Sequence, residues 1–248
     1  PCSGPSGRCR GCTQNDLAQI DATDGGRAEA GRSALAVSDR VLSPSRDLGT
    51  RMAQLTGTPV GEVALPVSAP PPPEPMPSGP LRFLFVGSLL ATKGPDRLLR
   101  AFQGLPPGVA RLTLVGPGDS TFAHALRAAA TATPGVSMLG AVAPAAVGPL
   151  LARHDVLILP STWAENSPLV VREALSAGLR VLGPRQGGTQ ELDPEVVLVS
   201  RDLSDQAFRA LLLAEIKRGR QPRVARRWPS PREHARWLAQ EVYAGEPS

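Results

Sequence analysis

Hydrophobic and polar positions alternate regularly from Leu81 to the end of the chain. Short apolar runs, most of them closed by a glycine or a proline, alternate with amphipathic stretches of about ten residues. The apolar runs predict strands over residues 82–87, 111–116, 136–139, 155–160, 180–182 and 196–199. The amphipathic stretches predict helices over residues 95–103, 120–131, 144–153, 168–177, 204–218 and 231–243. Strands that alternate with helices imply right-handed βαβ units, so we expect an α/β fold with a parallel sheet flanked by helices.

The pattern before Leu81 is weaker. Residues 1–67 are rich in Gly, Ser and Asp and hold few large apolar side chains, so we do not expect this piece to bury a core alone. We expect a helix over residues 28–37, a short strand over residues 40–45 that ends in a turn, and a helix to about residue 55 that Ser45 caps. We therefore expect residues 1–67 to be the end of a domain.

A proline-rich segment separates this piece from the regular pattern. Residues 68–80 include consecutive prolines from Pro70 to Pro73 and predict a semi-rigid linker in extended polyproline geometry. The first residue is Pro1 and not Met, so we expect the chain to begin inside a longer protein. The expected organisation is a domain end over residues 1–67, the linker, and a second domain over residues 81–248.

Composition narrows the class of protein. The hydrophobic fraction of 42% is compatible with a packed core, and no apolar run is long enough to span a membrane. Aromatic residues make up only 4% of the chain, which weighs against a stacking platform for nucleic acid. We therefore expect a globular protein that does not bind nucleic acid.

The formal net charge is +5, and much of the surplus is local. The basic stretch consists of Arg209, Lys217, Arg218, Arg220, Arg223, Arg226 and Arg227, opposed only by Glu215. One interpretation is the solvated face and end of a helix. The other is contact with an anionic membrane surface or an anionic acceptor.

All three cysteines lie near the start of the chain, at Cys2, Cys9 and Cys12. The spacing of the last pair is that of a zinc knuckle, but a fourth ligand is missing from this sequence. A metal site, a disulfide and no role at all stay open as alternatives.

The first candidate motif follows the strand at residues 82–87. Gly87 allows a ligand to approach the backbone closely, and the helix that begins at Pro95 offers free N–H groups and a positive dipole end. Lys93 would add a full positive charge there. Taken alone, the motif also fits a turn glycine and a surface lysine, because it matches neither common phosphate-binding pattern.

The second candidate motif is a pair of carboxylates, Glu165 and Glu173, separated by seven residues. Glu165 follows an apolar strand, and Glu173 lies in the next helix, whose start Ser167 is expected to cap. Carboxylates at the carboxyl end of a parallel strand can accept hydrogen bonds from sugar or ribose hydroxyls. Alternatively, they are a loop acid and a surface acid paired with Arg172 or Arg153.

The third candidate motif is a glycine-rich loop after the strand at residues 180–182. Gly187 and Gly188 again allow close approach of the backbone, and Thr189 is expected to cap a short helix. Alone, this loop carries no specific function. The order of the three motifs on successive βα turns is more informative than any one of them.

Together the motifs resemble the C-terminal half of a family 4 glycosyltransferase of the GT-B architecture. The similarity runs from about Phe83 to Gly188 and is carried by Phe85-Val-Gly-Ser-Leu with Lys-Gly, by Glu165 and Glu173 followed by Ala-Leu-Ser-Ala-Gly, and by Gly-Gly-Thr-Gln-Glu-Leu. The resemblance implies a Rossmann-like sheet, with residues 1–67 as the remnant of an acceptor-side domain. Residues 81–248 would then bind the nucleotide sugar and end in a helix that crosses back.

The resemblance also implies roles for individual residues. Glu173 would accept hydrogen bonds from the ribose of the donor, and Glu165 would hold the transferred sugar and support the developing positive charge. Lys93 would neutralise the departing nucleotide diphosphate. The donor-binding residues implied in this way are Gly87, Ser88, Lys93, Glu165, Asn166, Ser167, Leu169, Val170 and Glu173. Family members retain anomeric configuration and need no metal for the donor, so no cofactor is expected.

This sequence departs from the family pattern in two places. Many members carry Arg where this chain has Ser88, which leaves Lys93 with more of the diphosphate charge. The catalytic histidine of the family lies in the N-terminal domain, and His124, His154 and His234 are in the wrong places to replace it. We expect these three histidines to have surface or core roles.

These features predict a cytoplasmic, retaining glycosyltransferase of polysaccharide or glycolipid synthesis. Its donor would be a nucleotide-diphosphate sugar and its acceptor a saccharide or lipid-linked molecule, and peripheral contact with the inner face of the membrane is an added expectation. The alternatives are a non-catalytic nucleotide-sugar-binding module and a protein that binds surfaces through its basic stretch.

Overall fold

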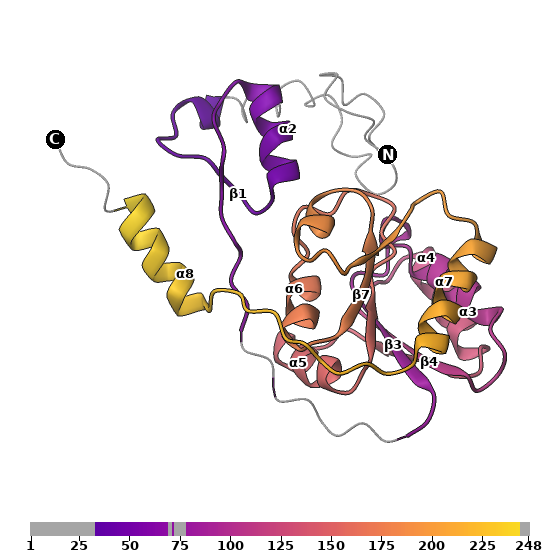
Figure 1. The fold of residues 1–248 in the computed structure, drawn as a ribbon. Helices are drawn as coiled ribbons and strands as arrows, with labels where there is room; N and C mark the ends of the chain where they lie inside the picture. The colour runs from indigo at the N-terminus through magenta and orange to yellow at the C-terminus, as the bar shows by residue number, and fades with distance from the viewer. Residues whose placement is uncertain (1–32, 69–70, 72–77, 244–248) are drawn as a thin grey trace.

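The structure is a computed structural model and describes residues 33–68, 71 and 78–243. Figure 1 shows a sheet domain and a smaller unit that precedes it. Cys2, Cys9 and Cys12 lie outside the described residues. The same is true of much of the helix expected over residues 28–37, of which residues 33–36 are helical.

A parallel sheet of six strands forms the centre of the sheet domain. Its strand order is β5-β4-β3-β6-β7-β8, and every neighbouring pair is parallel. The strands are β3 (Leu81–Val86), β4 (Ala110–Val115), β5 (Val136–Gly140), β6 (Val156–Ile158), β7 (Arg180–Pro184) and β8 (Val197–Val199). Each apolar run named above forms one of these strands, with small differences at the ends.

Helices cover both faces of this sheet. On one face lie α3 (Pro95–Gln103), α4 (Thr121–Thr131) and α7 (Asp205–Arg218), and on the other lie α5 (Pro144–Ala152) and α6 (Leu169–Ser176) (Figure 1). The side chains of Phe83, Leu84 and Phe85 in β3 are all fully buried, because both faces of the strand are covered. The expected α/β fold with a flanked parallel sheet is therefore confirmed.

The smaller unit consists of two short strands and a helix. β1 (Leu42–Ser43) pairs in parallel with β2 (Gly61–Glu62), and α2 (Arg46–Thr56) connects them. Ser45 caps α2 as predicted, because its hydroxyl oxygen accepts a hydrogen bond from the N–H of Leu48 at 3.3 Å.

The chain returns to the smaller unit after α7. Val67 donates its backbone N–H to the carbonyl of Pro229 at 3.0 Å. α8 (Pro231–Trp237) begins with a capping box between Ser230 and Glu233 and continues as the π-helix η3 (Leu238–Tyr243). The single helix expected over residues 231–243 is therefore an α-helix followed by a π-helix.

Arginines fasten the crossing segment, residues 219–230, to the sheet domain. Arg220 pairs with Asp155 at 2.9 Å, and Arg226 pairs with Asp193. Both arginines belong to the basic stretch, so part of its charge is used inside the fold. Membrane contact by the other basic side chains stays a prediction, and none of the described helices is long and apolar enough to cross a bilayer.

Arg223 of the crossing segment is bonded to backbone carbonyls instead of a carboxylate. Its guanidinium donates to the carbonyl oxygens of Ala152 at 3.0 Å and His154 at 2.7 Å. Burial without a carboxylate bonded to it lowers the pKa of Arg223. The side chain therefore satisfies carbonyl groups at the C-terminal end of α5 and in the turn before β6, and it is not free to bind an external anion.

Replacing Arg223 by Ala should lower the free energy of unfolding by about 2 kcal/mol, because two carbonyls lose a charged donor. Urea denaturation measures this change. Arg218→Ala is the matched control, since Arg218 is exposed at the end of α7, and its effect should stay within about 0.5 kcal/mol. Equal effects of the two substitutions would contradict the assigned role of Arg223.

Candidate functional site

The loops after β3, β6 and β7 meet at the carboxyl-terminal edge of the sheet. β3 and β6 are neighbours although the chain forms β4 and β5 between them, and β7 pairs with the far side of β6. The strand order reverses at β3 and β6, which is where open α/β sheets bind their ligands. The fold thus brings together three motifs that lie far apart in the sequence.

The loop after β3 is held against the loop after β6. The N–H of Thr162 donates to the carbonyl of Thr92 at 2.9 Å. Gly94 has a φ of +70°, and a Cβ atom there would lie 2.3 Å from the carbonyl oxygen of Pro160, so only glycine fits. These contacts direct Lys93, the residue between them, toward the end of β6.

Lys93 and Glu165 form an ion pair across these two loops. The Lys93 Nζ lies 2.7 Å from Oε1 and 3.0 Å from Oε2 of Glu165. The Glu165 residue is only 6% exposed, so its carboxylate depends on protein donors. The structure therefore joins the lysine of the first motif to the first acid of the second.

Two further donors reach the same carboxylate. The Ser161 hydroxyl and the Trp163 indole N–H both donate to Oε1 of Glu165, the latter at 2.9 Å. The Lys93 ammonium also lies 5.0 Å from the centroid of the Trp163 ring. Oε1 thus accepts three hydrogen bonds, whereas Oε2 accepts one, from Lys93, among the described residues.

The loop after β7 supports the backbone of Glu165. Gly187 forms a parallel bridge with Glu165, and the N–H of Gly188 donates to the Glu165 carbonyl at 2.7 Å. Gly187 has a φ of +80°, and a Cβ there would lie 2.2 Å from that carbonyl oxygen. The close approach that the paired glycines predict is therefore an approach to the neighbouring loop.

Two predicted helix caps are wrong. Pro168 occupies the N-cap of α6, and the buried hydroxyl of Ser167 instead accepts a hydrogen bond from Nε of Arg172 at 3.0 Å. Thr189 lies inside the 3₁₀ turn η2 (Gly188–Glu191), whose N-cap is Gly187. In both cases the real cap residue has no side-chain oxygen, and the hydroxyl group is turned toward the protein interior.

Glu173 differs sharply from Glu165. It lies in α6, is half-buried, and has no hydrogen-bond or ion-pair partner among the described residues. Burial therefore raises the pKa of the Glu173 carboxyl. Arg172 beside it does not pair with it, because its guanidinium is directed to Ser167 and lies 4.4 Å from the ring of Trp228.

The other predicted donor residues leave backbone and side-chain groups without partners. The first N–H groups of α6, at Leu169 and Val170, have no acceptor among the described residues, and neither do the N–H and hydroxyl of Ser88. Asn166 and Leu169 are exposed. Gly87 is engaged, since its N–H donates to the carbonyl of Val115 at 2.9 Å. The arrangement can receive an anion or hydroxyl groups.

None of the histidines joins the Lys93–Glu165 pair. The ring nitrogens of His154 contact the carbonyl of Leu150 and the hydroxyl of Thr113, and burial lowers its pKa, so it is a core residue. His124 contacts Asp119 on the surface, and His234 stacks against Trp237. The surface and core positions expected of these three histidines are confirmed.

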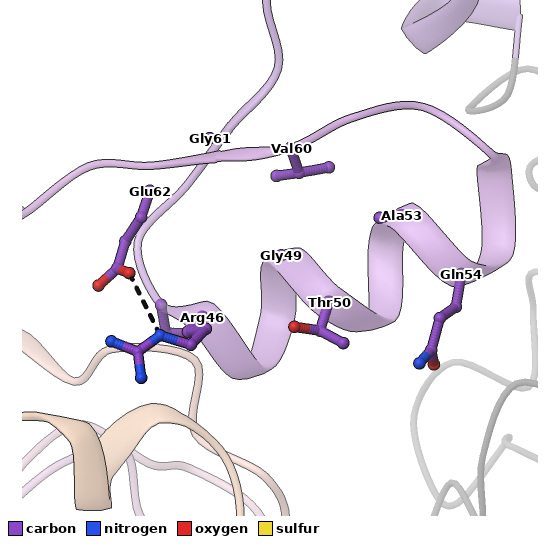
Figure 2. Close-up of a pocket in the computed structure, with 9 residues that line it drawn as sticks. Arg46, Gly49, Thr50, Ala53, Gln54, Val60, Gly61 and Glu62 are labelled. Carbon is purple, nitrogen blue, oxygen red and sulfur yellow. Dashed lines mark ion pairs between the residues drawn. The ribbon is translucent and has the colours of Figure 1, made fainter.

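A pocket of about 360 Å³ lies elsewhere, on the smaller unit (Figure 2). It is formed between α2 and residues 60–62, where Gly49 and Gly61 leave space. No predicted donor residue lines it. Its Arg46 and Glu62 side chains, 3.7 Å apart, are both well exposed. Lys93 and Glu165 do not line it, although its Arg46 contacts the loop after β7 through Glu191.

Sequence reasoning missed the residues that act through tertiary contacts. Glu191, at the end of the third motif, accepts backbone hydrogen bonds from Arg46 at 2.8 Å and Asp47 at 2.7 Å. It thereby covers the N-terminus of α2 in the smaller unit. Trp163 and Ser161 were missed in the same way, because no spacing rule relates them to a carboxylate in the same loop.

The fold and its edge define a Rossmann-like α/β domain of the GT-B architecture. The profile of one family, described as glycosyl transferases group 1, matches residues 80–214, which is more than half of the chain. The chain belongs to the glycosyl transferases group 1 family. No curated protein matches it.

Several solved structures share the fold at low sequence identity. HepE of Anabaena, in complex with UDP and glucose, is 19% identical with a TM-score of 0.65 over 76% of this chain and 57% of that chain. WaaG, a glycosyltransferase involved in lipopolysaccharide biosynthesis, is 17% identical with a TM-score of 0.62, over 83% and 62%. Sucrose-phosphate synthase of Thermosynechococcus elongatus is 18% identical with a TM-score of 0.70, over 92% and 64%. This chain therefore spans less than two thirds of each.

Glu173→Gln should make the ligand-free protein more stable at neutral pH. The raised pKa means that the folded protein holds the Glu173 proton more tightly than the unfolded chain does. Stability is therefore lost as the pH rises through the folded pKa, and Gln avoids that loss. The advantage should disappear below the unfolded pKa of the carboxyl, as followed by thermal unfolding between neutral and acid pH. Glu195→Gln, at an exposed site, is the control. A pH-independent difference would contradict this account.

Proposed function

We propose that this chain supplies the donor site of a retaining glycosyltransferase that uses a nucleotide-diphosphate sugar. The observation that carries the proposal is the Lys93–Glu165 ion pair at the switch point of the sheet, together with the unpaired carboxylate of Glu173 in α6, the helix that follows Glu165. Membership in the glycosyl transferases group 1 family supports the same reaction class. An ammonium and two carboxylates of different character suit a ligand with both an anionic and a hydroxyl-rich part.

In this proposal Glu173 binds the ribose. A carboxylate accepts hydrogen bonds only, and two neighbouring hydroxyls can satisfy both of its oxygens. Such contacts would also remove the cost of leaving this half-buried charge without a partner. The solved structures of HepE hold UDP and UDP-glucose, so uridine nucleotides are the first probes for this chain.

Lys93 and the start of α6 would bind the diphosphate. An ammonium has three N–H donors, and the contacts to Glu165 use at most two of them. The remaining N–H, with the unpaired N–H groups of Leu169 and Val170 and the Ser88 loop, would stabilise negative charge on the departing nucleotide diphosphate. Because Ser88 is uncharged, the ammonium contributes the full positive charge here.

Glu165 would face the transferred sugar through Oε2, the oxygen with a single donor. The carboxylate would hold a sugar hydroxyl there and support positive charge at the anomeric carbon. The acceptor would be a saccharide or lipid-linked molecule, held with the help of a further domain. We assign residues 1–67 to the end of that acceptor-side domain, residues 68–80 to the linker and residues 81–248 to the donor-binding domain.

Isothermal titration with UDP-glucose and other common nucleotide-diphosphate sugars tests donor binding. Glu173→Ala and Lys93→Met should each weaken binding about tenfold to a hundredfold, because each removes hydrogen bonds that involve a charged group. Lys217→Ala and Glu195→Ala, both at exposed sites, are the matched controls and should bind like the wild type. No binding of any common donor by the wild type would overturn the proposal.

A second candidate is a module that binds the nucleotide sugar without transferring it. The observation that favours it is that none of the three histidines lies beside the Lys93–Glu165 pair. The two candidates differ in turnover. With a saccharide acceptor and the domain that completes the site, a transferase should form product with the anomeric configuration of the donor, as seen by proton NMR. Binding without product would favour the module, and an inverted product would contradict retention.

A further inference from the structure

Trp163 contacts both members of the Lys93–Glu165 pair, but the proposed function assigns it no role. Its indole N–H donates to Oε1 of Glu165 at 2.9 Å, and the centroid of its ring lies 5.0 Å from the Lys93 ammonium. Trp163 is nevertheless 49% exposed. Core packing therefore does not explain its position.

The two contacts of Trp163 act on different charges. The N–H gives the buried Glu165 oxygen a donor that carries no charge of its own, so the carboxylate depends less on Lys93. The ring face attracts the ammonium from the side of Trp163. The ammonium already contacts both oxygens of Glu165, at 2.7 and 3.0 Å. Without the indole N–H, only Lys93 and Ser161 would donate to Oε1, so the carboxylate would hold the ammonium more strongly and leave it less able to donate to a ligand.

We propose that Trp163 is a positioning residue that keeps the Lys93 ammonium and Oε2 of Glu165 available to the diphosphate and the sugar. The proposal rests on the proposed function, because it assumes that a nucleotide-diphosphate sugar is the ligand. It adds a residue and a physical device to that function. Ser161, the third donor to Oε1, assists from the fully buried side of the carboxylate.

Graded substitutions separate the two contacts. Trp163→Phe keeps an aromatic face for Lys93 and removes the N–H, whereas Trp163→Leu removes both. Because half of the side chain is exposed, both variants should fold, as circular dichroism will show. Trp237→Phe is the matched control, since Trp237 is 37% exposed on α8 and contacts His234.

Titration of the full chain with UDP-glucose and with UMP provides the readout. Trp163→Phe should bind UDP-glucose about tenfold more weakly than the wild type, by loss of one hydrogen bond to a charged group. Trp163→Leu should lose about a further twofold to fivefold from the cation–π contact. Binding of UMP should stay within about twofold for every variant, because UMP lacks the β-phosphate and the sugar. A general structural defect would weaken both ligands together.

The outcomes separate this inference from the proposed function. Weaker UDP-glucose binding in the order Phe then Leu, with UMP unchanged, supports the positioning role. Wild-type binding of UDP-glucose that Trp163→Phe leaves unchanged overturns the positioning role and leaves the proposed function standing. Failure of the wild type to bind any nucleotide-diphosphate sugar overturns the proposed function, and the positioning role with it. Equal weakening of UMP and UDP-glucose also overturns the positioning role.

A measurement without ligand checks the underlying contact. In a nitrogen–proton correlation spectrum, Glu165→Gln should shift the indole resonance of Trp163, because the acceptor loses its charge. The resonance of Trp237, which has no contact with Glu165, should stay in place. An unmoved Trp163 resonance would show that the hydrogen bond is absent, and it would overturn the inference independently of any binding result.

Discussion

The buried carboxylate of Glu165 is the interaction on which the rest of the site depends. A charge at this depth is tolerated only if donors surround it, and the donors come from different segments. Lys93 reaches it from the loop after β3, Ser161 and Trp163 from its own loop, and the glycines after β7 hold its backbone. All three loops therefore contact the same residue, Glu165. The backbone of Gly94 also lies close to the carbonyl of Pro160, and this approach brings the neighbouring Lys93 to the end of β6.

Glu165 and Glu173 show how one residue type can take two physical states within one site. Oε1 of Glu165 accepts three hydrogen bonds, from Lys93, Ser161 and Trp163. Glu173 is half-buried and has no partner among the described residues, and its pKa is raised. A buried carboxylate with several donors gains little from a further one, whereas a half-buried carboxylate without donors gains most from a ligand. The two carboxylates therefore differ in their partners: Glu165 is bonded to residues of two loops, whereas Glu173 has no donor among the described residues.

The site is also linked to the smaller unit. Glu191 lies at the end of the loop whose glycines contact the Glu165 backbone. Its carboxylate accepts hydrogen bonds from the first two N–H groups of α2. Arg172, one residue before Glu173, approaches the carbonyl of Pro44 at 3.5 Å. The crossing segment then returns to the same unit through the Pro229 carbonyl. Glu191 and Arg172, which neighbour the donor-binding residues of our proposal, thus contact both the sheet domain and the smaller unit.

Local sequence determined the elements of this protein, because apolar runs and amphipathic stretches report directly on burial, and Pro95 and Ser45 mark helix starts by chemistry that acts within one turn. It also determined which residue types stand in the loops at the ligand edge. Only the tertiary structure decided how they are paired. Lys93 and Glu165 are distant in sequence and meet because β6 is inserted beside β3, a consequence of strand order that no local pattern encodes. The same reason explains why Ser167 and Thr189 do not cap helices. Local sequence predicts that each hydroxyl accepts a hydrogen bond from a backbone N–H, but tertiary packing directs both hydroxyls into the interior.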